Sequence, residues 1–147
     1  MKIVMMIFVG VWLAACKNGP AEPSVAGEPV PLPAECYLAV SNKDTIRIKW
    51  VASGDSVNGT LDYHFFEKDR NTGTLRGRFH GDTLIGDYEF DAEGTRSVRQ
   101  VAFLKQGSAY REGYGPMQER GGKMVFSDAR QITFDGNVIL NKTDCPD

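Results

Sequence analysis

Two charged residues, Arg99 and Glu112, stand at expected inward positions of a β-sheet and could together bind a polar or anionic ligand. A two-residue hairpin loop at 106–107 would place Arg99 opposite Tyr114 and Glu112 diagonal to Arg99, within reach of a long side chain. Charges inside a barrel need partners, because burying an isolated charge is strongly unfavourable. A purely structural pair is the alternative, as are solvated side chains if the register slips by one residue. The candidate pocket consists of Arg99, Glu112, Tyr110, Tyr114 and Ser97.

No other set of residues in the sequence has the spacing that catalysis requires. The two histidines, His64 and His80, fall on expected outward faces or turns and have no third ligand nearby, so we expect no metal site. Nucleophile-elbow, Walker-type and dinucleotide-binding motifs are missing, so we expect a non-enzymatic protein without catalytic residues or cofactors. The 17 basic and 19 acidic residues nearly balance, which argues against nucleic acid as a partner.

The three cysteines indicate an exported protein. Cys36 and Cys145 lie near the two ends of the expected domain, and a disulfide between them would close a loop of about 110 residues. The chain-entropy model assigns such a closure at most about 4.7 kcal/mol. A metal site and two free thiols are the alternatives, but no Cys-x-x-Cys motif or histidine cluster accompanies the pair.

Residues 1–15 have the pattern of a secretory signal peptide. Lys2 precedes an apolar run over 3–13, which as a helix would be about 16 Å long and therefore too short for a bilayer core of about 30 Å. The sequence Leu-Ala-Ala-Cys at 13–16 resembles the lipobox of bacterial lipoproteins. That resemblance implies lipidation of Cys16 by a diacylglyceryl group and an acylated (for example palmitoylated) amino terminus. A plain secreted protein with a chance Cys16 is the alternative.

Lys17 and the residues after it bear on location. By resemblance to the sorting rule of enteric bacteria, the lack of aspartate at position 17 favours the outer membrane, on its periplasmic face or at the cell surface. Residues 16–35 would then be the lipidated amino terminus and a disordered tether, since five of the seven prolines fall between positions 20 and 33. The lipid would be the contact with the membrane, and we expect a monomer.

The remaining chain, 36–145 with a short tail at 146–147, is predicted to be all-β. Apolar and polar residues alternate over 46–50, 57–65, 75–79 and 84–90, and Gly, Asn or Asp mark the turns between these runs. Short connections between neighbouring strands predict an antiparallel up-and-down meander of about eight to ten strands that closes into a small barrel. An open two-sheet sandwich is the alternative. The region 116–130 has the weakest pattern and predicts one short strand.

Several short segments of the domain are distinctive: DTI at 44–46, GTLDY at 59–63, EKD at 67–69, GDTL at 81–84, YEF at 88–90, EG at 93–94 with SVR at 97–99, and EGYG at 112–115. These segments resemble small lipoproteins of Bacteroidota. The resemblance covers most of residues 36–145 and implies no established activity, so it transfers no functional residue. Lipocalins share the expected barrel, but their Gly-x-Trp signature is missing around Trp50.

The sequence therefore predicts a lipid-anchored, non-enzymatic module that binds a small ligand or an envelope protein. An inhibitor of an external hydrolase such as lysozyme, or an envelope stress protein, is the alternative. A cavity lined by Arg99 and Glu112 would favour ligand binding, whereas a filled barrel with protruding loops at 67–72 or 91–97 would favour inhibition.

Overall fold

The alternation of apolar and polar residues produces ten β-strands in the computed structural model, which describes residues 32–67, 70–92 and 94–146. The inward residues of each strand are buried and the outward ones exposed, as in a sheet with one face turned to the core. The strands are β1 (Ala34–Ser41), β2 (Asp44–Ser53), β3 (Ser56–His64), β4 (Arg70–His80), β5 (Thr83–Ala92), β6 (Thr95–Gln106), β7 (Ala109–Gly113), β8 (Met117–Arg120), β9 (Lys123–Phe126) and β10 (Ile139–Thr143). A three-residue 3₁₀ helix, Ala129–Gln131, follows β9.

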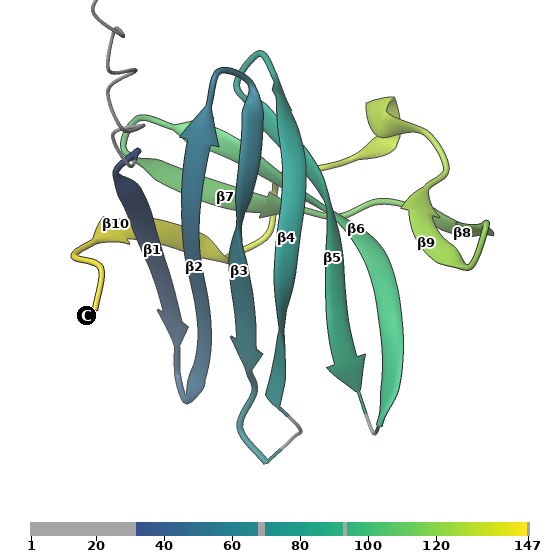
Figure 1. Ribbon diagram of the computed structural model, residues 1–147, viewed down its shortest axis with the longest axis horizontal. Helices are drawn as coiled ribbons and strands as arrows, with labels where there is room; N and C mark the ends of the chain where they lie inside the picture. Colours follow the sequence, from purple (N-terminus) through teal and green to yellow (C-terminus); the bar gives the residue numbers. More distant parts are fainter. Residues whose placement is uncertain (1–31, 68–69, 93, 147) are drawn as a thin grey trace, which may run out of the picture. The chain divides into compact units, whose positions relative to one another are not determined.

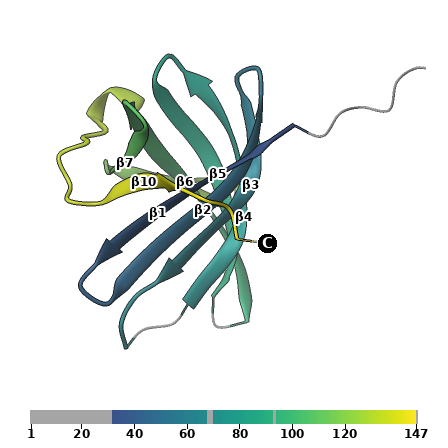
Figure 2. The same ribbon diagram turned by 90° about the vertical axis from the view of Figure 1, so that its left-hand side faces the viewer.

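Eight of these strands close into an antiparallel barrel, so the sandwich alternative is wrong. Strands β1 to β7 follow one another as a meander, and β10 fills the last position between β7 and β1 (Figures 1 and 2). Because every barrel strand then has two neighbours, the edges that would attract other chains are removed over most of the barrel.

The region 116–130 lies outside the barrel and contains more structure than its weak pattern predicts. Strands β8 and β9 form a hairpin that projects from the barrel in Figure 1, and it is attached to β6 through one parallel pairing, Arg99 with Met124. The expected single strand near 125–126 is therefore half of a hairpin. Its shortness explains the weak signal, since four residues per strand barely establish an alternation.

One predicted hairpin register is confirmed and another is wrong. A two-residue loop at 81–82, indicated in the sequence by Gly81 and Asp82, predicts that Phe79 pairs with Leu84, and the β4–β5 hairpin has this register. In the β6–β7 hairpin the loop is 107–108 rather than 106–107, so Phe103 pairs with Glu112 instead of Tyr110. In both hairpins glycine takes the first of the two loop positions, with φ of 61° at Gly81 and 64° at Gly107. The predicted pairing on β6 is therefore wrong by two residues. Glu112 still faces inward, but it lies opposite Phe103 instead of Val101.

The opposed glycines Gly77 and Gly86 allow two strands to approach closely and leave no hollow beside them. A Cβ atom on Gly77 would lie 2.9 Å from the Cα of Gly86 and 2.9 Å from a methyl carbon of Leu84. A Cβ on Gly86 would lie 3.0 Å from a methyl carbon of Leu75. The two leucine side chains therefore fill the space that the missing side chains leave, and the pair serves packing and strand curvature.

The cysteines at the two ends of the domain lie together. The sulfur atoms of Cys36 and Cys145 are within disulfide-bonding distance, and their Cα atoms are 5.1 Å apart. Cys36 lies on β1 next to β10, where it pairs with Thr143. A disulfide here holds the first and last strands of the barrel together at the seam where the sheet closes.

The first barrel strand begins slightly before the expected domain boundary, because Ala34 and Glu35 already belong to β1. The predicted signal peptide, Cys16 and most of the tether lie outside the described residues. Within the described ranges, no helix is long and apolar enough to cross a membrane.

Candidate functional site

The candidate site lies inside the barrel, toward the end that carries the β1–β2 and β3–β4 loops. Arg99 comes from β6, Glu112 from β7 and Tyr63 from β3, and Tyr114 follows the end of β7. Each of the first three occupies an inward position in the alternation of its strand, and closure of the sheet brings the three strands around one interior.

Glu112 is held by two tyrosine hydroxyl groups. Its Oε1 accepts a hydrogen bond of 2.5 Å from Tyr63, and its Oε2 accepts one of 2.8 Å from Tyr114. With 4% of its surface exposed, Glu112 is the one fully buried charged residue among those that the structure describes. Two good donors compensate in part for the removal of the carboxyl group from water.

Burial changes the acidity of this group. Desolvation raises the pKa of Glu112 above its ordinary value, although the hydrogen bonds from Tyr63 and Tyr114 and the positive charge of Arg99 act in the opposite direction. Desolvation, reinforced by the nearby Glu112, also raises the pKa of Tyr63 far above that of a free phenol. Tyr63 is therefore protonated at any physiological pH and donates its hydrogen to Glu112.

Arg99 lies against aromatic rings and lacks an acidic partner. Its guanidinium carbon is 5.0 Å from the ring centre of Tyr63 and 5.7 Å from those of Tyr88 and Phe90. In the described part of the chain, no carboxylate oxygen lies within 4.0 Å of an Arg99 nitrogen, and the buried Nε has no hydrogen-bond acceptor. Arg99 and Glu112 therefore do not form the expected ion pair. Arg99 packs against aromatic rings, and Glu112 accepts hydrogen bonds from two tyrosine hydroxyl groups.

A cavity of about 240 Å³ is lined by Arg99 and Glu112 together with Tyr63 and Tyr114. Its wall is mainly apolar, with the guanidinium of Arg99 and the carboxyl of Glu112 as its charged groups. A mostly apolar hollow with a few convergent polar groups is the usual character of a small-molecule site. The lining residues include Ile46, Tyr63, Phe65, Asn71, Arg99, Val101, Glu112, Tyr114, Met117, Phe126 and Val138.

The structure brings together three of the five residues of the candidate pocket. Arg99, Glu112 and Tyr114 line the cavity. Tyr110 lies on the other side of the interior, with its ring 4.9 Å from that of Tyr37 and 5.0 Å from that of Trp50. Ser97 pairs with Phe90 near the start of β6 and is not among the cavity-lining residues. The register error in the β6–β7 hairpin accounts for Tyr110, which pairs with Lys105 and therefore lies farther from Arg99 than expected.

The sequence-based prediction missed Tyr63, Tyr88 and Phe90 as neighbours of Arg99. All three occupy inward positions of alternating runs, so their burial was predictable. Tyr88 pairs directly with Arg99 in the β5–β6 hairpin, so the register of that hairpin alone places Tyr88 and Phe90 beside Arg99. Tyr63 reaches Arg99 across the interior from β3, which does not pair with β6, so only the closure of the barrel brings it there.

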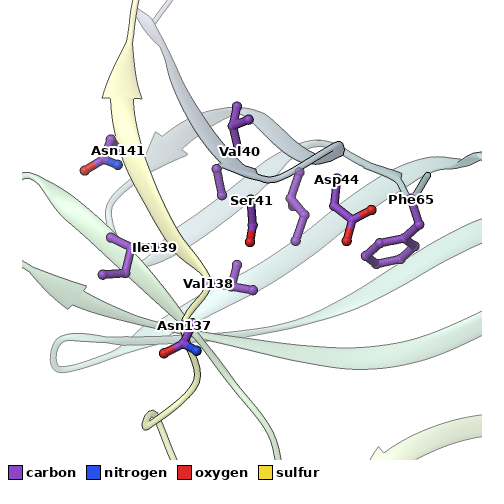
Figure 3. A pocket seen from close by; sticks show the side chains of 10 residues that line it. Val40, Ser41, Asp44, Phe65, Asn137, Val138, Ile139 and Asn141 are labelled. Atoms are coloured by element: carbon purple, nitrogen blue, oxygen red, sulfur yellow. The ribbon is translucent and has the colours of Figure 1, made fainter.

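A second cavity of about 280 Å³ adjoins the first, since Ile46, Phe65 and Val138 line both. It lies between the end of β1 and the start of β10, and Figure 3 shows Ser41 and Val138 directed into it. Its remaining lining residues are Ala39, Val40, Asp44, Asn137, Ile139 and Asn141.

Comparison with known proteins adds no further identification. No protein-family model, no curated protein and no solved structure matches this chain. Across residues 32–67, 70–92 and 94–146, no group of three or more His, Cys, Asp or Glu side chains is arranged to hold a metal ion. The function must therefore be argued from the cavity and its two charged side chains.

Proposed function

We propose that this protein is a lipid-anchored, non-enzymatic module of the bacterial cell envelope whose barrel binds a small ligand carrying an anionic group. The observation that supports the proposal most directly is the buried Nε of Arg99, which has no acceptor and lies at a cavity of about 240 Å³. An unsatisfied buried donor on a charged group is costly, so a ligand oxygen that accepts from it would recover that cost.

The chemistry of the wall limits the ligand. Glu112 is held by Tyr63 and Tyr114, and neither of its oxygen atoms lies within 4.0 Å of an Arg99 nitrogen, so it does not pair with Arg99. The ligand needs an oxyanion for Arg99 and an apolar body for the aromatic and aliphatic wall. An engineered cavity of about 150 Å³ binds benzene, so a space of about 240 Å³ accommodates a small carboxylate such as hexanoate or benzoate.

The presence of this cavity favours binding over inhibition of an external hydrolase. The inhibitor alternative assumed a filled barrel that presents only its loops, whereas this barrel has two adjoining cavities at one end. The envelope location rests on the sequence of residues 1–16 alone, and it is tested separately.

The anchor is tested with the variant Cys16→Ser. We expect the wild-type chain to fractionate with outer membranes and to incorporate radiolabelled palmitate, and the variant to incorporate none. Equal palmitate incorporation by both chains would contradict lipidation at Cys16.

Ligand binding is tested by calorimetric titration of hexanoate into the mature chain, residues 16–147 carrying Cys16→Ser so that no detergent is needed. We expect binding that Arg99→Gln weakens at least about tenfold, because a charge-assisted hydrogen bond contributes about 1.5–3 kcal/mol. The matched control is Arg96→Gln, which removes an exposed arginine of the same strand that pairs with Glu89 and Asp91. Hexanamide should bind more weakly than hexanoate. Equal binding by wild type and Arg99→Gln would contradict the proposal.

A further inference from the structure

The barrel is not paired along its full length where it closes. β1 pairs with β2 over eight residues, from Ala34 to Ser41, but with β10 only at Cys36, Tyr37 and Leu38. Among the described residues, no pairing with β10 continues beyond Leu38, so the edge of β1 from Ala39 to Ser41 has no strand beside it. The seam between the first and last strands therefore opens toward the Arg99 end.

The cavity of about 280 Å³ occupies this opening. Ala39, Val40 and Ser41 line it from β1, and Val138 and Ile139 line it from β10 and the residue before it. Figure 3 shows the two strands separated here, with the labelled side chains around the space between them. We call this cavity the seam slot.

The seam slot adjoins the Arg99 cavity at an apolar junction. Ile46, Phe65 and Val138 line both cavities. The lining of the slot is mixed: Val40 and Ile139 are aliphatic and exposed to 65% and 37%, and Ser41, Asp44, Asn137 and Asn141 supply polar atoms. Exposed aliphatic side chains on either side of an unpaired seam gain by covering an apolar chain.

We infer that the barrel binds an unbranched carboxylic acid whose head group lies at Arg99 and whose aliphatic tail passes the Ile46–Phe65–Val138 junction into the seam slot. The inference rests on the proposed function and specifies its ligand as a medium-chain acid. The charge determines the direction of binding, because Arg99, whose buried Nε has no acceptor, lines the first cavity and not the seam slot. The slot determines the shape, since it lies between the ends of two neighbouring strands, β1 and β10, and an unbranched chain can lie along such a seam.

The inference predicts a dependence on chain length that a single closed cavity would not produce. Titration of the mature chain with butanoate, hexanoate, octanoate and decanoate, each below its micellar concentration, should show rising affinity beyond six carbons. Full burial of a methylene gives about a fourfold gain in affinity, so we expect about two- to fourfold for each added methylene in a partly open slot. The corresponding amides should show the same dependence on length at lower affinity.

The variant that tests the slot is Ser41→Trp, which places a large ring at an exposed position directed into it. Ser41 does not line the Arg99 cavity, so hexanoate should bind with unchanged affinity while the gain for octanoate and decanoate is lost. The matched control is Ser53→Trp, which places the same ring at an exposed serine of the β2–β3 hairpin and should behave like wild type.

The outcomes separate the two proposals. Absence of any hexanoate binding overturns the proposed function and this inference together. Hexanoate binding without a gain for longer acids, or a gain that Ser41→Trp retains, overturns the seam slot and leaves the Arg99 site in place.

Discussion

The two ends of the barrel interior have the same architecture and opposite character. At one end the rings of Tyr37, Trp50, Phe79 and Tyr110 pack edge to face or tilted, with centroids 4.9–6.3 Å apart. At the other end aromatic rings pack equally closely, with Tyr88 and Phe90 at 4.7 Å, but Arg99 and two cavities lie beside them. Aromatic content therefore does not distinguish a packed end from a hollow one.

The two ends differ in whether their charged side chains have partners. Glu35 at the packed end accepts hydrogen bonds from Tyr37 and Trp50, and its other oxygen accepts from Lys142 at 2.9 Å, so each charge has a partner. The hydrogen bond from Lys142 is the main reason why the pKa of Glu35 lies below its ordinary value. At the hollow end the pKa of Glu112 is raised, and Arg99 retains an unused donor. The charged groups at the packed end are hydrogen-bonded and stabilise the fold, whereas the free donor of Arg99 at the hollow end is the group that we propose for ligand binding.

The largest expected effect comes from the packed end. Trp50→Ala removes a fully buried ring that packs against Tyr37, Phe79 and Tyr110, and it should lower the free energy of unfolding by about 3–5 kcal/mol. Urea denaturation measures the change. The comparison between the ends would be wrong if Phe65→Ala, at the junction of the two cavities, cost as much.

Loss of the disulfide between Cys36 and Cys145 should have the second largest effect on stability. Reduction, or the double variant Cys36→Ser/Cys145→Ser, should lower the free energy of unfolding by about 2–4 kcal/mol. Below its melting temperature the variant should still bind hexanoate, because the cysteines lie at the packed end. Unchanged thermal stability on reduction would show that the bond contributes nothing to closure.

A smaller effect should separate the two donors on Glu112. Tyr63→Phe leaves a buried carboxyl oxygen without its donor and should cost about 1–3 kcal/mol. Tyr114→Phe should cost less, because Tyr114 is 48% exposed and water can replace its hydroxyl group. Equal losses in chemical denaturation would contradict the difference in burial that defines the site.

The smallest expected effect is a dependence on pH. A raised folded-state pKa means that Glu112 contributes most favourably below the ordinary pKa of a glutamate, and that this contribution is lost as the pH rises through the folded-state value. Stability relative to Glu112→Gln should therefore fall as the pH rises above the ordinary pKa of a glutamate, and the subtraction cancels groups common to both chains. A relative stability that rises with pH would show that Glu112 is held as a paired carboxylate.

Much of this molecule follows from local sequence. The alternation predicts β2 to β5 and their inward residues, and the loop at 81–82 predicts its register, because a period of two and a glycine turn act over a few residues. The positions of Cys36 and Cys145 predict their proximity, since both flank the alternating region.

The candidate site was only partly predictable. Arg99 and Glu112 were identified from their inward positions, but their partners depend on a loop shifted by one residue and on contacts across the barrel. The seam slot has no sequence signal, because it arises where β10 stops pairing with β1. Long-range closure, rather than strand formation, determines where the hollow lies.

Each end carries a side-chain N–H group that nuclear magnetic resonance can observe, the Nε–H of Arg99 at the hollow end and the indole N–H of Trp50 at the packed end. Titration of the mature chain with hexanoate therefore compares the ends within one sample. The account predicts that the Arg99 signal shifts saturably while the Trp50 signal, whose donor is already bonded to Glu35, stays in place. A saturable shift at Trp50 without one at Arg99, or no shift at either, would contradict it.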